Sequence, residues 1–222
     1  QGEITRKILD DIGIENFVIG SETTVEEVQE IMNDFKMKLE KGFCVAFVIR
    51  KNAFSFDVDF EYYNNNLLRR EEVIQHIISV SKTDPIISTT GKISRELFEI
   101  RDRNRDKHIY DFLTVGSMGH CSSIALGIAI MKSENTIWCI DGDGSILMHL
   151  GAIPVIASCN PDNLIHIVIN NGAHESVGGQ PTVMENLEIA DIAKACGYPY
   201  TVTVRSAKEL DFELQAAKEI IC

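Results

Sequence analysis

The sequence contains no run of lysine and arginine residues. Its 21 basic and 33 acidic residues give the 222-residue chain a formal net charge of −12. Such a chain repels nucleic-acid phosphates and anionic lipid surfaces, so we expect neither nucleic acid nor a membrane among its partners. Small anions remain possible ligands, because backbone amides can hold them. With 45% hydrophobic and 24% charged residues, the composition favours a globular protein over a disordered one.

A long hydrophobic run is also missing. The most apolar stretch, residues 124–131, is far shorter than the ~20 residues needed to cross a bilayer. The first residues carry no signal-peptide core, so we expect a cytoplasmic protein. The six cysteines form no Cys-x-x-Cys pair, and the six histidines show neither the His-Glu-x-x-His pattern nor a cluster with cysteines at the spacing of zinc ligands. We therefore predict reduced core thiols and no zinc site.

The first 52 residues show a short α/β pattern. Apolar spacing predicts helices over residues 4–12 and 25–35, and strands over residues 17–19 and 43–49. Residues 53–69 interrupt every apolar period with acidic side chains and three consecutive asparagines. We predict an interdomain linker there.

From residue 70 onward, helices and strands alternate strictly. The predicted helices cover residues 70–82, 92–104, 120–132, 145–158 and 186–196, with a last one from residue 207. The predicted strands cover residues 86–88, 112–115, 136–140, 164–169 and 200–204. This order predicts a second α/β domain over residues 70–222, built on a doubly wound, mostly parallel sheet. Its central strands are apolar on successive residues, as strands buried on both faces are.

Four loops that follow strands are rich in Gly, Ser, Thr, Asp or Asn. They are residues 88–92, 116–120, 141–145 and 170–174. Because parallel strands end at the same edge of a sheet, we expect all four loops to meet there. Ligands bind at that edge, beside helix amino termini whose N–H groups are unpaired.

Asp143 and Asn171 stand 28 positions apart, each shortly after a predicted buried strand. One strand–helix–strand unit would bring the carboxylate and the amide side by side. Magnesium takes about six oxygen ligands, of which only one or two are protein carboxylates. One Asp, one Asn and a loop carbonyl therefore fit a magnesium ion that bridges a bound diphosphate. Without Asn171, an isolated Gly-Asp-Gly sequence would be read as an ordinary turn.

Other phosphate and metal motifs fit these loops less well. An EF-hand loop beginning at Asp141 needs Gly where Ile146 stands and Glu where Ala152 stands. A Walker A loop needs Ser or Thr where Ile93 stands, and the dinucleotide pattern Gly-x-Gly-x-x-Gly breaks at Leu147. A flavodoxin-like or NAD-binding module stays open as an alternative, although it would not use the Asp and Asn pair.

The sequence Gly142-Asp-Gly-Ser145 followed by Asn170-Asn171 resembles the signature of thiamine diphosphate-dependent enzymes, in which Gly-Asp-Gly precedes Asn-Asn by two to three dozen residues. Residues 116–120, 122–127 and 170–182 are similar to the phosphonopyruvate decarboxylases of the 2-oxo acid decarboxylase family, with sulfopyruvate decarboxylases as near neighbours. The resemblance covers nearly the whole chain. It implies decarboxylation of phosphonopyruvate to phosphonoacetaldehyde and carbon dioxide, in phosphonate biosynthesis, with thiamine diphosphate and Mg²⁺. A sulfopyruvate decarboxylase-type enzyme and an inactive cofactor-binding fragment are the alternatives.

The resemblance implies cofactor-binding roles for residues in all four loops. Asp143 and Asn171 would bind Mg²⁺ through side-chain oxygens, and Ala173 through its main-chain oxygen. Met118 would lie beneath the bent cofactor. The whole expected cofactor-binding set is Thr89, Thr90, Gly91, Gly116, Ser117, Met118, Gly142, Asp143, Gly144, Ser145, Asn171 and Ala173. Helix capping is the alternative role for the Ser and Thr residues, and core packing for the methionine.

Two histidines and two cations complete the expected site. His174 and His120 are the candidate catalytic residues, acting as acid, base or hydrogen-bond donor. Packing within the loops is the alternative for both. Lys92 and Arg95 lie near a predicted helix amino terminus and would bind the small anionic 2-oxo acid substrate through its phosphonate or sulfonate. Solvated charges on a helix surface are the alternative.

The resemblance also implies that part of the family pattern lies outside this sequence. Residues 1–52 resemble the carboxyl-terminal part of a pyrimidine-binding domain, and residues 70–222 resemble a diphosphate-binding domain. The family's glutamate that contacts the aminopyrimidine would precede residue 1, and a last strand would follow Cys222. We therefore expect the chain alone to be inactive. We also expect a homo-oligomer, in which the pyrimidine-binding domain comes from the same or a neighbouring subunit.

Overall fold

A computed structural model describes residue 2, residues 4–55 and residues 65–221. The chain divides into two compact units, residues 1–59 and 60–222, and each unit is described here by itself. Of the linker predicted over residues 53–69, residues 56–64 lie outside the described part. Among the described residues, no helix is both long and apolar enough to span a bilayer.

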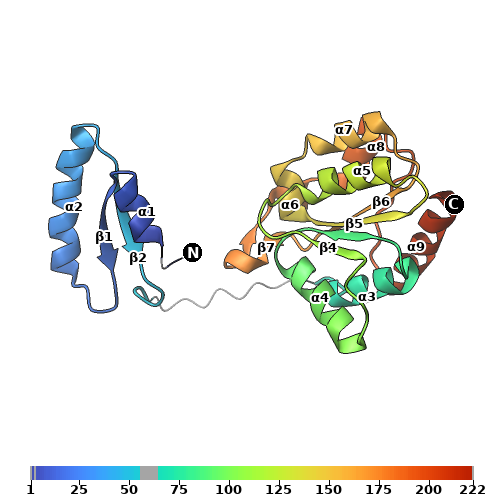
Figure 1. Ribbon diagram of the computed structural model, residues 1–222, viewed down its shortest axis with the longest axis horizontal. Helices are drawn as coiled ribbons and strands as arrows, with labels where there is room; N and C mark the ends of the chain where they lie inside the picture. Colours follow the sequence, from blue (N-terminus) through green and yellow to red (C-terminus); the bar gives the residue numbers. More distant parts are fainter. Residues whose placement is uncertain (1, 3, 56–64, 222) are drawn as a thin grey trace. The chain divides into compact units, whose positions relative to one another are not determined.

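The first unit is a parallel two-stranded sheet with two helices (Figure 1). Helix α1 (Thr5–Asp11) leads into strand β1 (Glu15–Ile19), and helix α2 (Val25–Glu40) leads into strand β2 (Val45–Ile49). A capping box starts α2: the Thr24 hydroxyl accepts from the Glu27 N–H, and the Glu27 carboxylate accepts from the Thr24 N–H. Phe35 is buried and packs against Phe47 with ring centroids 4.9 Å apart. These contacts attach α2 to the sheet.

The second unit is a doubly wound α/β fold, which confirms the predicted fold class (Figure 1). Its strands are β3 (Ile86–Ser88), β4 (Asp111–Leu113), β5 (Ile137–Gly142) and β6 (Leu164–Ile169), in the spatial order β4-β3-β5-β6 and all parallel. Its longer helices are α3 (Arg70–Ser81), α4 (Lys92–Asn104), α5 (Cys121–Met131), α7 (Ala152–Cys159), α8 (Ile189–Cys196) and α9 (Ala207–Ile221).

Successive residues of β5 point to opposite faces of the sheet, and both sets are covered by helices. Trp138 and Ile140 belong to a core cluster with residues of α3, α4 and α9. Ile137 and Cys139 belong to a second cluster with residues of α5. Every residue of β5 is buried, which explains why its first four residues, 137–140, are apolar without alternation.

The strand order creates a switch point between β3 and β5. From β3 the chain moves outward to β4, then returns to β5 on the other side of β3 and continues to β6. The loops after β3 and β5 therefore leave towards opposite faces, and a crevice opens between them at the carboxyl ends of the strands. Thr89 follows β3 and Asp143 follows β5, so the predicted loops stand beside this crevice.

Two predicted elements differ from the structure by more than the position of their ends. The helix predicted over residues 145–158 is instead two helices, α6 (Asp143–Met148) and α7. Pro154 explains the break: in a continuous helix its ring would clash with the Leu150 carbonyl, whereas the first turn of α7 accepts it. The strand predicted over residues 200–204 is absent from this described segment. Tyr200 and Val202 are 44% and 46% exposed, so their apolar alternation does not mark a paired strand.

Two short strands and two 3₁₀ turns connect β6 to α8. Strands β7 (Ala173–His174) and β8 (Gln180–Pro181) form a small antiparallel pair, and a 3₁₀ turn, η1 (Glu175–Val177), lies between them. A second 3₁₀ turn, η2 (Val183–Asn186), precedes α8, so the helix predicted from residue 186 begins at Ile189. This connection extends the loop after β6 along the carboxyl edge of the sheet.

A buried ion pair fastens α4 to the edge strand β4. Arg101 donates through Nε and Nη2 to the two carboxylate oxygens of Asp111, both at 3.0 Å, and the side chains are 5% and 0% exposed. We predict that Arg101→Ala lowers the free energy of unfolding by about 3–5 kcal/mol, because it leaves a buried carboxylate unpaired. Urea titration followed by fluorescence of Trp138, the single tryptophan, measures this.

Arg103→Ala is the matched control, because Arg103 pairs with Glu71 at the surface and its side chain is 59% exposed. Its removal should cost less than about 1 kcal/mol. Equal losses in the two variants would contradict the structural role of the buried pair.

Candidate functional site

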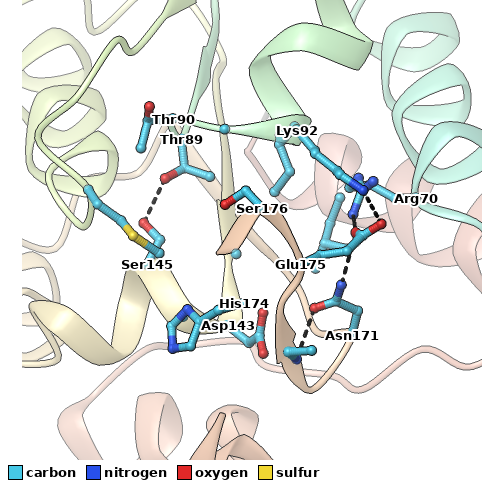
Figure 2. A pocket seen from close by; sticks show the side chains of 17 residues that line it. Arg70, Thr89, Thr90, Lys92, Asp143, Ser145, Asn171, His174, Glu175 and Ser176 are labelled. Carbon is cyan, nitrogen blue, oxygen red and sulfur yellow. Dashed lines mark hydrogen bonds and ion pairs between the residues drawn. The ribbon is translucent and has the colours of Figure 1, made fainter. Parts of the chain in front are cut away.

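A pocket with a volume of about 80 Å³ lies at the switch point. It is lined by residues 89–93 after β3, residues 142–145 after β5, and most of residues 169–176 after β6, together with Arg70 and Met118 (Figure 2). Three of the four loops predicted to meet at one edge thus supply most of its wall. The fourth loop, after β4, contributes Met118.

The Ser145 hydroxyl joins three of these loops. It lies 2.6 Å from the Thr89 hydroxyl (Figure 2), and it accepts a hydrogen bond of 3.0 Å from the Gly119 N–H. Ser145 and Thr89 are each at most 2% exposed. The loops after β3, β4 and β5 are therefore held together by buried hydrogen bonds at the pocket.

Asp143 is the first residue of α6, and it is buried at 4% exposure. One of its carboxylate oxygens, Oδ2, accepts a hydrogen bond of 2.7 Å from the Thr182 hydroxyl. Thr182 is itself tied to the β6 loop, because its N–H donates to the Gly172 carbonyl at 2.9 Å. A carboxylate has about four lone-pair positions, so this contact orients Asp143 and leaves it able to bind a cation.

Asn171 lines the same pocket, and its amide is oriented from both ends (Figure 2). Its Oδ1 accepts from the Ala173 N–H at 3.3 Å, and its Nδ2 donates to Glu175 at 3.4 Å. The structure therefore brings Asp143, Asn171 and Ala173, the three expected magnesium ligands, to one pocket wall. Within the described part of the chain, no three His, Cys, Asp or Glu side chains gather as a metal site.

Gly144 leaves the space that two neighbouring side chains fill. A Cβ atom on Gly144 would lie 2.5 Å from His174 Cε1 and 3.3 Å from Met118 Cε. The His174 imidazole and the Met118 side chain thus both reach the backbone at Gly144, although they come from the β6 and β4 loops. His174, the expected catalytic residue, and Met118, the residue expected beneath the cofactor, therefore lie next to each other at the pocket.

Some expected residues lie outside the pocket. His120 is exposed and packs against His149, with ring centroids 4.1 Å apart. Arg95 is exposed on α4 and is not among the residues that line the pocket. Gly116 and Ser117 are also exposed; the Gly116 N–H donates to the Thr90 hydroxyl at 3.1 Å. For His120, this placement matches the packing alternative.

Three charged side chains meet at one end of the pocket: Arg70, Lys92 and Glu175 (Figure 2). Arg70 and Lys92 each donate to a different oxygen of the Glu175 carboxylate. Burial raises the pKa of Glu175, but the hydrogen bonds from Lys92 and Arg70 outweigh it and hold the pKa below its usual value. Of these three residues, sequence reasoning identified Lys92 alone as a site residue, because no local pattern connects Arg70 to Glu175, 105 residues later.

Two buried side chains, Asp141 and His166, lie next to the start of the β5 loop. Asp141 is fully buried, its Oδ1 accepts from the Gly142 N–H at 2.9 Å, and its Oδ2 lies 3.6 Å from His166 Nε2. Burial raises the pKa of Asp141, but His166, Ser145 and the Gly142 N–H together lower it below its usual value. Asp141 therefore fixes the start of the loop that carries Asp143.

A family model described as "Thiamine pyrophosphate enzyme, C-terminal TPP binding domain" matches residues 89–220. A phosphonopyruvate decarboxylase of Streptomyces viridochromogenes is 39% identical over 132 residues, which are 60% of this chain and 32% of that protein. The chain thus spans about a third of the length of that relative. A sulfopyruvate decarboxylase subunit beta of Methanocaldococcus jannaschii is 40% identical over 151 residues, 67% of this chain and 77% of the subunit.

A solved structure has the same fold. The benzoylformate decarboxylase of Polynucleobacter necessarius matches with a TM-score of 0.57 and 19% identity, over 75% of this chain and 34% of that one. At this identity the likeness supports the α/β architecture.

Gly119 tests how tightly the β4 and β5 loops are joined. Its φ is +90°, and an added Cβ would lie 2.8 Å from the Ser145 carbonyl oxygen. We predict that Gly119→Ala lowers the free energy of unfolding by about 1–3 kcal/mol, because strain and a backbone clash add up. Thermal unfolding of the variant measures the loss.

Gly151→Ala is the matched control, because its φ is −62° and a Cβ there would meet no atom within 4 Å. This variant should be as stable as the parent, or more stable by up to about 1 kcal/mol. A Gly119→Ala variant as stable as the control would show that the loops are not locked together.

Proposed function

The chain belongs to the thiamine pyrophosphate enzymes, and on that premise we propose that it carries the diphosphate-binding part of a 2-oxo acid decarboxylase. The single observation that carries this proposal is the common pocket of Asp143, Asn171 and Ala173 at the switch point of the sheet. We propose phosphonopyruvate as the substrate, with phosphonoacetaldehyde and carbon dioxide as products. A sulfopyruvate decarboxylase activity is the second candidate, supported by the sulfopyruvate decarboxylase subunit beta, of which this chain covers 77%.

The residues present fit a bound diphosphate with its magnesium ion. Asp143 offers a carboxylate, Asn171 an amide oxygen and Ala173 a main-chain oxygen, the hard-oxygen donors that Mg²⁺ takes from proteins. Thr89 and Thr90 line the opposite side of the pocket and would donate hydroxyl groups to the phosphate oxygens. Gly144 lets the His174 imidazole and the Met118 side chain approach the backbone beside these groups, a space that a Cβ atom would close. These groups would hold the cofactor's diphosphate end.

Other side chains would act on the substrate. When bound, thiamine diphosphate supplies the electron sink that loss of carbon dioxide from a 2-oxo acid requires. His174, which lies beside Gly144, would hold or deliver a proton at the product carbon through its imidazole. Met118, against the same glycine, would support the cofactor from below. Lys92 would hold the substrate's terminal anion.

The remaining part of the site would come from elsewhere. Residues 1–52 would be the carboxyl-terminal part of a pyrimidine-binding domain, supported by the parallel α/β arrangement of β1 and β2. A complete pyrimidine-binding domain would be supplied by the same or a neighbouring subunit of a homo-oligomer. The relative that is named as a subunit beta supports a requirement for a second polypeptide. The alternative is a chain that binds the cofactor without turnover.

Cofactor binding is tested by thermal unfolding. At a concentration about 100 times the dissociation constant, thiamine diphosphate with Mg²⁺ should raise Tm by about 5–10 °C. Asp143→Ala should abolish this shift, because it removes the single carboxylate of the magnesium site. Asp162→Ala, an exposed carboxylate, is the control and should keep the shift. If Asp143→Ala kept it too, the metal assignment would be wrong.

Decarboxylation is tested by measuring carbon dioxide release from phosphonopyruvate and from sulfopyruvate. We expect no turnover from the chain alone, and turnover once a polypeptide carrying the pyrimidine-binding segment is added. A higher kcat/KM for phosphonopyruvate would support the first candidate, and a higher value for sulfopyruvate the second. Turnover by the chain alone would show that the essential glutamate has been placed in the wrong segment.

A further inference from the structure

The cation pair at the end of the pocket is already occupied by an anion. Arg70 Nη1 donates to Glu175 Oε2 at 2.6 Å, and Lys92 Nζ donates to Glu175 Oε1. The two cations begin different helices, α3 and α4, while Glu175 begins the 3₁₀ turn η1. The carboxylate therefore bridges two cations that belong to separate elements of the fold (Figure 2).

Arg70 is fixed independently of Glu175. Its Nε donates to Glu96 Oε2 at 2.8 Å, and its Nη2 donates to Glu96 Oε1, so Glu96 holds the guanidinium from the α4 side. This pairing uses one edge of the guanidinium and leaves Nη1 pointing at Glu175. The Arg70 side chain is 17% exposed. Removal of Glu175 would therefore leave Arg70 in place as an anion receptor.

The Glu175 carboxylate is held less firmly than the Arg70 guanidinium, so another anion can take its place. It lies in a connection that contains Gly172 and Gly178, both with positive φ, and not in the sheet or a long helix. Its side chain is 30% exposed and that of Lys92 is 40% exposed. Partly exposed ion pairs contribute little to stability, so another anion can compete for the same two cations.

The positions of the two Glu175 carboxylate oxygens also suit a particular class of ligand. A phosphonate or sulfonate group presents several oxygens around one atom, and two of them can take the places of Oε1 and Oε2. Arg70, Lys92 and Glu96 together carry a net charge of +1 once Glu175 has left, so an incoming anion is electrostatically favoured. Neutral or purely carbon-terminated 2-oxo acids offer no such group.

We propose that Arg70 and Lys92 form the receptor for a tetrahedral oxyanion on the substrate, and that Glu175 occupies this receptor until the ligand displaces it. The inference rests on the proposed function for the identity of the ligand, and it adds Arg70 as a binding residue and Glu175 as an internal competitor. The site thereby selects 2-oxo acids that carry a second, tetrahedral anionic group.

The experiment measures binding of two unreactive probes, methylphosphonate and methanesulfonate, by their effect on Tm at constant ionic strength. It uses the chain with and without saturating thiamine diphosphate and Mg²⁺. Glu175→Gln should bind the probes at least threefold more tightly than the parent, because the internal competitor is lost. Lys92→Gln should bind them about tenfold more weakly, because one charge-assisted hydrogen bond is lost.

Arg103→Gln is the matched control, since it removes an exposed cation from the same helix, α4, and should leave probe affinity within twofold. Unchanged affinity in Glu175→Gln, or in Lys92→Gln, would overturn the inference. Loss of the probe effect when thiamine diphosphate and Mg²⁺ are added to the parent would also overturn it, because the probes would then occupy the diphosphate position.

The same measurements separate this inference from the proposed function. A rise in Tm with the cofactor but no effect of the probes contradicts this inference alone. A probe effect without a cofactor shift contradicts the proposed cofactor site alone.

Discussion

The hydroxyl of Ser145 is the contact on which the arrangement of the pocket depends. It accepts from the Gly119 N–H and bonds with the Thr89 hydroxyl, so the loops after three strands converge on one buried oxygen. Strand order alone brings these loops to one edge of the sheet. The Ser145 contacts fix their relative positions, and Asp141 beneath them anchors the start of the β5 loop. Asp143 thereby reaches the pocket from a rigid support.

The pocket has two ends of opposite electrostatic character. At one end the Asp143 carboxylate and the oxygens of the β6 loop are suited to a cation. At the other end Arg70 and Lys92 are suited to an anion, although Glu175 now neutralises them. Under the proposed function, a diphosphate with its magnesium ion and a substrate with its own anionic group would thus occupy neighbouring positions without competing for the same charges. The loop after β6 contributes to both ends, through Asn171 and Glu175.

Local sequence patterns predict an element correctly where its contacts are local or repeat along a helix or strand. Helix α4 and strands β3 and β6 lie where periodicity predicts them, because their buried faces impose that periodicity. The helix predicted over residues 145–158 is wrong because apolar spacing does not detect the break that Pro154 imposes between α6 and α7. The apolar alternation of residues 200–204 predicts a strand, but a strand also needs a neighbouring strand with which to form hydrogen bonds, and this segment has no strand assignment in the structure. The Arg70–Glu175 pair was not predictable, because its two residues meet only through the tertiary fold.

The most direct measurement of the central claim is the position of the divalent ion itself. Crystals of the chain grown with Mn²⁺ and thiamine diphosphate should show an anomalous scattering peak within coordination distance of the Asp143 carboxylate, the Asn171 amide oxygen and the Ala173 carbonyl. The diphosphate should complete the coordination from the side of Thr89. A peak bound elsewhere, or a diphosphate with Asp143 and Asn171 turned away from it, would contradict the account.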